Sequence, residues 1–267
     1  MPPEEKDWLV EFEQKFENFL SALKRSTSRA VTALEDGQVE EIFGLKPDHN
    51  YRWNLNDDEL CSKPEFAQKR ALIRARLDVV LMLSLADEKR GLERKQNTST
   101  ASSQSYKSLK SMKVQFEKEL SMPVKIGGQL HKLNGKADFT LWYGSFKELE
   151  SHLVIVEAKA KGKASEGDQQ CHAYMGMIHH ARKKTGRKYT TVFGISTDSY
   201  IFSFFRTGQD SRLSTMHLVF GERSKEDELI ISHIRRIIRQ TASLKPVTGH
   251  IPAGSSASEL MDMDVGE

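Results

Sequence analysis

Apolar residues recur every three or four positions in two stretches of the N-terminal half, and this spacing predicts helices. The first stretch runs from Trp8 to about Leu34. The second runs from Pro64 to about Arg94, with a proline in its first turn as helices tolerate. Between them, residues 37–64 are rich in proline, asparagine and aspartate, which favours irregular structure.

The next part of the chain predicts one more helix and then a β-hairpin. Apolar residues keep helical spacing over Tyr106–Leu120. Two apolar stretches, Val124–Lys132 and Ala137–Tyr143, flank the turn-forming pair Asn134-Gly135 and read as its two strands. The second strand carries Asp138 at its start.

A run of β-branched and apolar residues, Leu153–Lys159, predicts a strand buried in a sheet. Alternate side chains of a strand share a face, so Glu157 and Lys159 project to the same side at its end. A charged pair near a core must form an ion pair, bind an ion or shift its pKa values. One interpretation is therefore a structural salt bridge. The other is a site in which Asp138, on a neighbouring antiparallel strand, brings a second carboxylate.

The C-terminal half predicts a helix, several strands and a last amphipathic helix. On the first helix, Gln170 and Tyr174 are one turn apart and share a face. The elements that follow are strands at Tyr189–Ser196, Tyr200–Arg206 and Met216–Phe220, and a helix over Lys225–Thr241.

Changes in composition suggest four parts of the chain. Residues 1–95 form an α-helical N-terminal region. Residues 96–105 are too polar to pack and predict a flexible linker, after which residues 106–245 form the core. Residues 246–267 are rich in serine, glycine and acids, which predicts a disordered acidic tail.

The composition is that of a globular protein of the cell interior. Charged residues make up 29% of 267 residues, and no apolar run is long enough for a membrane span. The N-terminus lacks the basic and apolar segments of a secretory signal. Two cysteines are too few for a disulfide framework or a cysteine zinc site. We therefore expect an intracellular protein of the nucleus or cytoplasm that does not enter membranes.

The order Asp138, then Glu157-Ala158-Lys159 at the end of an apolar strand, resembles the PD-(D/E)XK nuclease superfamily, the restriction-endonuclease-like fold. Gln170 and Tyr174 match the Q-x-x-x-Y helix motif of a recombination-exonuclease branch of that superfamily. The resemblance covers roughly residues 122–206. An alanine precedes Asp138 where the family name has proline. A weaker likeness is to nuclease-like domains of fungal mobile-element or Crinkler-type proteins.

This resemblance implies an α/β (α+β) fold, with a central mixed sheet flanked by helices and the α-helical N-terminal region packed on it. It also implies one or two Mg²⁺ or Mn²⁺ ions held by Asp138, Glu157 and the backbone carbonyl of Ala158. Lys159 would orient the attacking water. Gln170 would hydrogen-bond that water or the lysine, with Tyr174 in a supporting role.

The expected function is metal-dependent hydrolysis of phosphodiester bonds, with DNA as the expected substrate. The alternative is a catalytically inactive module of the same fold that binds nucleic acid or a protein partner. The helical N-terminal region would then recruit the partner or mediate self-association.

Three further groups of residues have competing interpretations. Glu119, or else Glu117, would be an additional acid of the site on the helix before the first strand, or a solvated charge. His172, His179 and His180 fit surface histidines better than a metal site. A basic run would contact phosphates, act as a nuclear import signal or form a solvated helix end. Its members are Arg182, Lys183, Lys184, Arg187 and Lys188.

Overall fold

The computed structural model describes residues 12–17, 27–35, 37–73, 77–97, 112–142, 152–221 and 224–243. Its strands are β1 (Thr27–Ala30), β2 (Lys46–Pro47), β3 (Lys113–Ile126), β4 (Gln129–Trp142), β5 (His152–Ala158), β6 (Val192–Thr197), β7 (Ile201–Thr207) and β8 (Arg212–Val219). The helices are α2 (Gln38–Phe43), α3 (Lys63–Leu72), α4 (Leu77–Asn97), α6 (Ala164–Lys184) and α7 (Ser224–Ser243). Two short 3₁₀ helices are η1 (Val31–Ala33) and η2 (Asp57–Glu59). In this part of the chain, no helix has the length and apolarity to cross a lipid bilayer.

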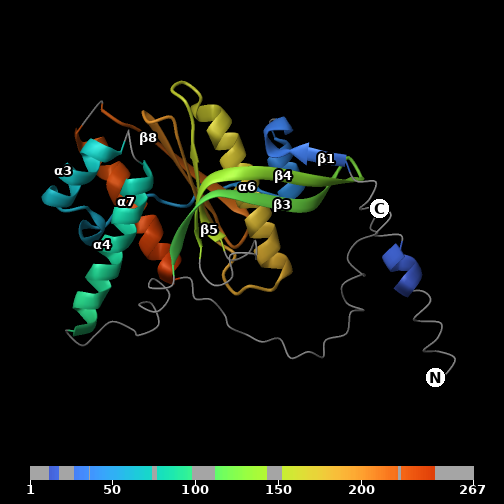
Figure 1. The fold of residues 1–267 in the computed structure, drawn as a ribbon, viewed down its shortest axis with the longest axis horizontal. Helices are drawn as coiled ribbons and strands as arrows, with labels where there is room; N and C mark the ends of the chain where they lie inside the picture. Colours follow the sequence, from blue (N-terminus) through green and yellow to red (C-terminus); the bar gives the residue numbers. More distant parts are fainter. Residues whose placement is uncertain are drawn as a thin grey trace.

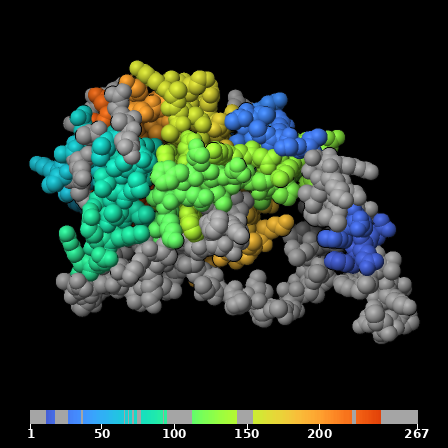
Figure 2. Space-filling view, in the orientation of Figure 1, coloured from blue at the N-terminus to red at the C-terminus, as the bar shows by residue number. Residues whose placement is uncertain are grey.

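The strands form one mixed sheet in the order β1-β4-β5-β6-β7-β8-β2, with β3 beside β4 (Figure 1). β5 and β6 are parallel, whereas β4–β5, β6–β7 and β7–β8 are antiparallel. The predicted α/β class and the mixed sheet are therefore confirmed. The β3–β4 hairpin forms an outer surface between α4 and the β1 segment (Figure 2).

Each face of the sheet has its own apolar core. On one face α6, η1 and α2 bury residues such as Leu133, Ile155 and Met177. On the other face α3, α4 and α7 bury residues such as Leu81 and Ile234. This three-layer packing explains why β5 and β6 are apolar on both sides.

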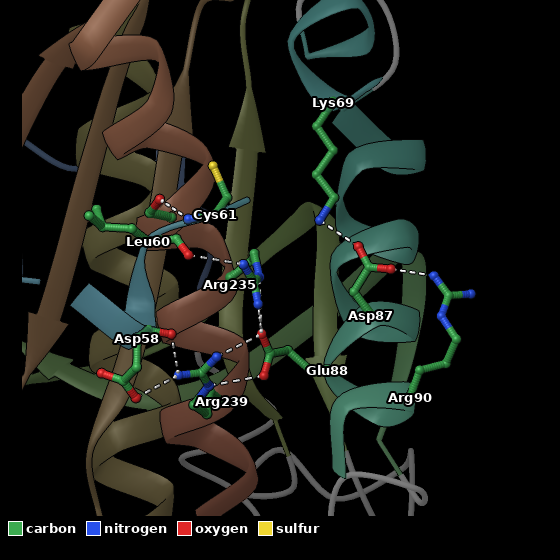
Figure 3. Close-up of polar contacts among 10 residues, drawn as sticks. Asp58, Leu60, Cys61, Lys69, Asp87, Glu88, Arg90, Arg235 and Arg239 are labelled. Atoms are coloured by element: carbon green, nitrogen blue, oxygen red, sulfur yellow. Dashed lines mark hydrogen bonds and ion pairs between the residues drawn. The ribbon is translucent and has the colours of Figure 1, made fainter. Parts of the chain in front are cut away.

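An ion-pair network joins α4 to α7 in the second layer (Figure 3). The carboxylate of Glu88, 6% exposed, accepts hydrogen bonds from Arg235 and Arg239 at distances of 2.9 to 3.2 Å. On the other side of α4, Lys69 of α3 lies 2.6 Å from Asp87. The arginines of α7 are thus engaged with protein groups.

The predicted hairpin turn at Asn134-Gly135 is wrong. The chain instead turns at Gly127-Gly128, where both residues have positive φ angles of 56° and 79°, as a two-residue hairpin turn of this kind requires. Asn134 lies within β4, and its side chain bonds Ser121 of β3 and Ser28 of β1. The asparagine therefore links three strands.

The helix predicted over Tyr106–Leu120 is also wrong where the structure describes it, because residues 113–120 belong to β3. The apolar positions 112, 114, 116, 120, 122 and 124 alternate, and this period of two continues past Pro123. β3 pairs with β4 along its length. Residues 106–111 lie outside the described residues.

The described part of the N-terminal region contains strands as well as helices. Residues 27–33 of the first predicted helix form β1 and η1, Leu34 is irregular and residues 12–17 are helical, whereas residues 8–11 and 18–26 lie outside the described residues. β1 pairs with β4 near one edge of the sheet, and β2 pairs with β8 at the other. Between them, η1 and α2 pack on α6. We call residues 27–47 the strap, because they cross α6 from one side of the sheet to the other.

Two further predictions in the N-terminal half differ from the structure. The single helix predicted over Pro64–Arg94 is two helices, α3 and α4, and the region predicted as irregular contains α2. The predicted strands and the helix after residue 150 correspond to β5, β6, β7, β8 and α7. The predicted linker at 96–105, apart from the end of α4, and the predicted tail at 246–267 lie outside the described residues.

Candidate active site

Glu157 is a fully buried carboxylate at the end of the buried strand β5. Its Oε2 atom accepts a hydrogen bond of 3.0 Å from Nζ of Lys159, whose side chain is 20% exposed. Its Oε1 atom is buried and has no hydrogen-bond partner within the described residues. The lysine therefore provides a hydrogen bond to only one of the two carboxylate oxygens.

Asp138 lies on β4, beside the end of β5. Its Oδ2 atom accepts a hydrogen bond of 2.7 Å from the backbone N–H of Ala158. This contact fixes one carboxylate against the strand that carries the other. Asp138 therefore contacts the end of the strand that carries Glu157.

The strands β3 and β4 change faces where Asp138 lies. Leu133 and Ala137 of β4 are buried on the α6 face, whereas Leu141 is buried on the α7 face. Strict alternation would place all three on one side. The residue of β3 opposite Asp138 is Glu117, whose φ of +51° interrupts the regular strand. A local irregularity therefore directs the Asp138 side chain toward β5.

Burial and the neighbouring charge of Asp138 raise the pKa of Glu157 from 4.5 to about 7, although the hydrogen bond from Lys159 opposes this shift. A carboxyl group that titrates near neutrality, in contact with a second acid and a lysine, is typical of functional sites. A cation placed between the two acids would favour the charged form of both.

Tyr174 fills a gap in the edge of β4. This edge pairs with β1 at residues 131–134 and with β5 at residues 139–142. Between them, the Tyr174 hydroxyl accepts a hydrogen bond from the N–H of Lys136 at 2.9 Å and donates one to its carbonyl at 3.2 Å. The tyrosine therefore holds the segment just before Asp138 in place.

Gly135 makes this contact sterically feasible. A Cβ atom at this position would lie 2.4 Å from the Tyr174 ring and hydroxyl, and 2.7 Å from Val31. Any larger residue would push the tyrosine away from the strand edge. The glycine that suggested a turn is thus a packing requirement.

Gln170 lies one helical turn before Tyr174 and is half-buried on the same face of α6. Its amide forms no hydrogen bond within the described part of the chain. The side-chain amide of the adjacent Gln169 instead donates a hydrogen bond of 2.8 Å to the Leu34 carbonyl of the strap. Gln170 therefore has hydrogen-bonding capacity left for a ligand.

Asp198 is a residue near the site whose role the sequence alone did not indicate. Its Oδ2 atom accepts from the N–H of Gly162 in the turn after Lys159. Its Oδ1 atom accepts from the N–H groups of Tyr200 and Ile201, in the turn after β6. These backbone hydrogen bonds lower the pKa of Asp198 despite the opposing effect of burial. Asp198 thus links the two turns beside the site.

Glu119 does not lie on a helix as expected. It is an exposed residue of β3 opposite Lys136, and its charge, with that of Glu117, raises the pKa of that lysine. Lys136 pairs with Glu117 at 2.8 Å. Both acids thus interact with Lys136 rather than with Glu157.

The basic run lies at the C-terminal end of α6, whereas Glu157 and Lys159 lie near its N-terminal end. A helix of 21 residues is roughly 30 Å long. Arg182 is 1% exposed and donates to the carbonyl of Tyr189, so it holds a loop and cannot contact phosphates. The exposed members of the run are Lys183, Lys184 and Lys188, while Arg187 is half-buried.

The three histidines of α6 differ in their surroundings. His179 is buried between the carbonyl of Thr190 and the hydroxyl of Ser211, which makes the expectation of a surface histidine wrong there. His172 packs on Phe205, and its burial lowers its pKa to about 4. His180 is exposed, as expected.

Few side chains at the Glu157 site could act as metal ligands. Among the described residues, no group of three or more His, Cys, Asp or Glu side chains is arranged to hold a metal. Mg²⁺, however, commonly uses only one or two carboxylates and completes its shell with water and substrate phosphates. Two carboxylates, one with an unpaired buried oxygen, fit such an ion.

The raised pKa of Glu157 gives a prediction for the metal-free protein. A pKa of about 7 in the fold against 4.5 means that the folded state favours protonated Glu157. Its contribution to the free energy of unfolding is therefore fully present below about pH 4.5 and is lost as pH rises through about 7. Thermal unfolding in chelator should show the melting temperature of the parent falling over this window relative to Glu157→Gln. A parent melting temperature that stays constant or rises with pH relative to that of Glu157→Gln would contradict the assigned shift.

Comparison with protein families finds no match for this chain, and comparison with curated proteins finds none either. One solved structure, titled "Crystal structure of SSO0001", aligns over 90% of this chain and 88% of its own. The identity is 14% and the TM-score is 0.20, so the alignment supports no conclusion about fold or function.

Proposed function

We propose that this protein is a metal-dependent nuclease that hydrolyses phosphodiester bonds of DNA. The observation that carries the proposal is Glu157, a fully buried carboxylate with one oxygen unpaired, beside Asp138 and bonded to Lys159. A carboxylate serving only as a structural ion pair would be expected to have both oxygens satisfied. An oxygen without a protein partner is therefore available to a metal ion or to a water molecule bound beside it.

Asp138 and Glu157, with the carbonyl oxygen of Ala158, are the groups that would hold Mg²⁺ or Mn²⁺. When bound, such an ion lowers the pKa of its water and neutralises charge on the scissile phosphate. The hydrogen bond from the N–H of Ala158 to Asp138 holds the Asp138 carboxylate beside the strand that carries Glu157.

The remaining residues act on the water and the substrate. Lys159, partly exposed and anchored by Glu157, would orient the water and stabilise the negative charge that develops on the phosphate. The free amide of Gln170 would hydrogen-bond that water or the lysine. Tyr174 acts indirectly by holding β4 at Lys136.

The direct test is a cleavage assay on duplex DNA, single-stranded DNA and RNA of the same sequence. Each substrate is incubated with purified protein in Mg²⁺, in Mn²⁺ or in chelator. We expect cleavage of DNA only in the presence of metal. No cleavage of any substrate under these conditions would favour the alternative, a binding module of this fold without activity.

The basic run gives a second prediction, which concerns binding rather than cleavage. Neutral substitutions of Lys183, Lys184, Arg187 and Lys188 should weaken DNA binding equally for unrelated sequences. Each lost phosphate contact should reduce the slope of log affinity against log salt by about 1. Fluorescence anisotropy in chelator measures both without cleavage.

The matched control for this prediction uses exposed cations of the opposite layer, Lys63, Arg90 and Arg94. Their neutral substitution should leave the salt slope unchanged. An unchanged slope in both sets would assign the basic run to a solvated helix end.

A further inference from the structure

A row of polar side chains crosses four neighbouring strands beneath α6. In register, Glu157 of β5 is paired with Ser196 of β6, Ser196 with Ser203 of β7, and Ser203 with His217 of β8. Paired residues project to the same face of a sheet. The row therefore begins at the candidate site and ends at exposed His217.

The far half of this row is hydrogen-bonded. The hydroxyl of Ser203 bonds Nδ1 of His217 at 2.9 Å and donates to Oδ2 of Asp168, on α6, at 3.2 Å. Ser203 is fully buried. Its hydroxyl is thus hydrogen-bonded to other protein groups.

The half of the row nearer the candidate site lacks such hydrogen bonds. The hydroxyl of Ser196 and Oε1 of Glu157 are both buried, and neither has a hydrogen-bond partner within the described residues. Oδ1 of Asp168 is in the same situation. An isolated buried polar group costs stability, so neighbouring unpaired groups in one row point to a shared partner.

Helix α6 passes close over this part of the row. A Cβ atom at Gly167 would lie 2.4 Å from the Ser196 hydroxyl and 3.0 Å from Cγ of Lys159. The backbone of α6 at Gly167 therefore lies close to both Ser196 and Lys159. One water molecule needs two to four polar partners, which these atoms can supply.

We propose that Ser196 is a positioning residue for Glu157: its hydroxyl holds the second carboxylate oxygen through one bridging water and so fixes the orientation of the carboxylate. Its effect on catalysis rests on the proposed nuclease function. The pairing itself does not, because it concerns two buried side chains of the folded protein.

A double-mutant cycle on stability tests the pairing. An unpaired hydroxyl would cost stability, so Ser196→Ala would then raise the melting temperature. If the hydroxyl serves Glu157, the same substitution lowers it. Combined with Glu157→Gln, the two changes should be non-additive by about fivefold or more in the unfolding constant. Additive effects, or a higher melting temperature for Ser196→Ala, would overturn the proposal.

Ser203→Ala is the matched control, because it makes the same change one strand farther along the row. Its effect should add to that of Glu157→Gln within error. Equal non-additivity for Ser203 would mean a general response of the sheet and would also overturn the pairing.

Cleavage kinetics test the positioning role. Ser196→Ala should lower kcat about tenfold with KM nearly unchanged, and Ser196→Cys, of similar size, should restore part of it. An unchanged kcat would overturn the role in catalysis. A parent protein without nuclease activity would overturn the proposed function, and the stability cycle would still decide the pairing.

Discussion

Cleavage of DNA by the Glu157→Gln variant should be at least about a thousandfold slower than cleavage by the parent protein. The substitution keeps the size of the side chain and removes the charge that a metal ion needs at the end of β5. It should also remove most binding of Mn²⁺ measured by calorimetry. Asp138→Ala should have a similar effect, and Lys159→Ala should be nearly as severe.

Glu93→Gln is the matched control for this substitution, because Glu93 is an exposed residue of α4 in the opposite layer. Its cleavage rate should equal that of the parent. Circular dichroism should show that all these variants are folded. Folded Glu157→Gln protein that cleaves as fast as the parent would disprove the nuclease mechanism proposed for this site.

The Glu88→Ala substitution should destabilise the protein by about 3 kcal/mol, measured by chemical denaturation. Glu88 is nearly buried and accepts hydrogen bonds from both Arg235 and Arg239 (Figure 3). Its removal leaves two guanidinium groups at the α4–α7 interface without their shared anion. Removing one member of a buried ion pair costs far more than the pair contributes to stability when intact.

Glu93→Ala makes the same change on the same helix at an exposed position, and it should change stability by less than about 0.5 kcal/mol. Glu88→Gln should fall between the two, because its amide can still accept one hydrogen bond. A Glu88→Ala protein as stable as Glu93→Ala would show that the arginines move into water without cost.

The parts of the fold that the sequence predicts well are those in which the local pattern and the tertiary structure agree. β5 is apolar on both sides because helices cover both faces of the sheet there. α6 presents a continuous apolar face to the same sheet. In both elements periodicity predicts which face the side chains of Glu157, Lys159 and Tyr174 share.

The errors occur where a local signal has a competing tertiary cause. Asn134-Gly135 is a strong turn signal, but Gly135 is required by the ring of Tyr174, 39 positions later in the sequence. The apolar residues of β3 satisfy helical spacing over a short window, and the competing period of two is visible only over the whole of residues 112–124. A short window of sequence therefore cannot distinguish the local signal from its tertiary cause in either case.

The candidate site was only partly accessible to sequence analysis. Asp138, Glu157 and Lys159 could be found because a motif places them in order. The half-satisfied state of Glu157, the gap that Tyr174 fills and the role of Ser196 all depend on strands brought together from distant parts of the chain. Likewise, no local pattern shows that Arg182 turns inward.

The strap sets an order of events during synthesis. Its strands leave the ribosome before most of the sheet that they join, and just beyond the strap Trp53 bonds Ser214, 161 residues later in the chain. At about 5–20 residues per second, that partner is made roughly 10–30 s after the tryptophan. During this interval β1 and β2 present unpaired backbone, and the apolar side of α2 lacks α6. We therefore expect the strap, although it is synthesised early, to acquire its packing only after α6 and β8 have been made.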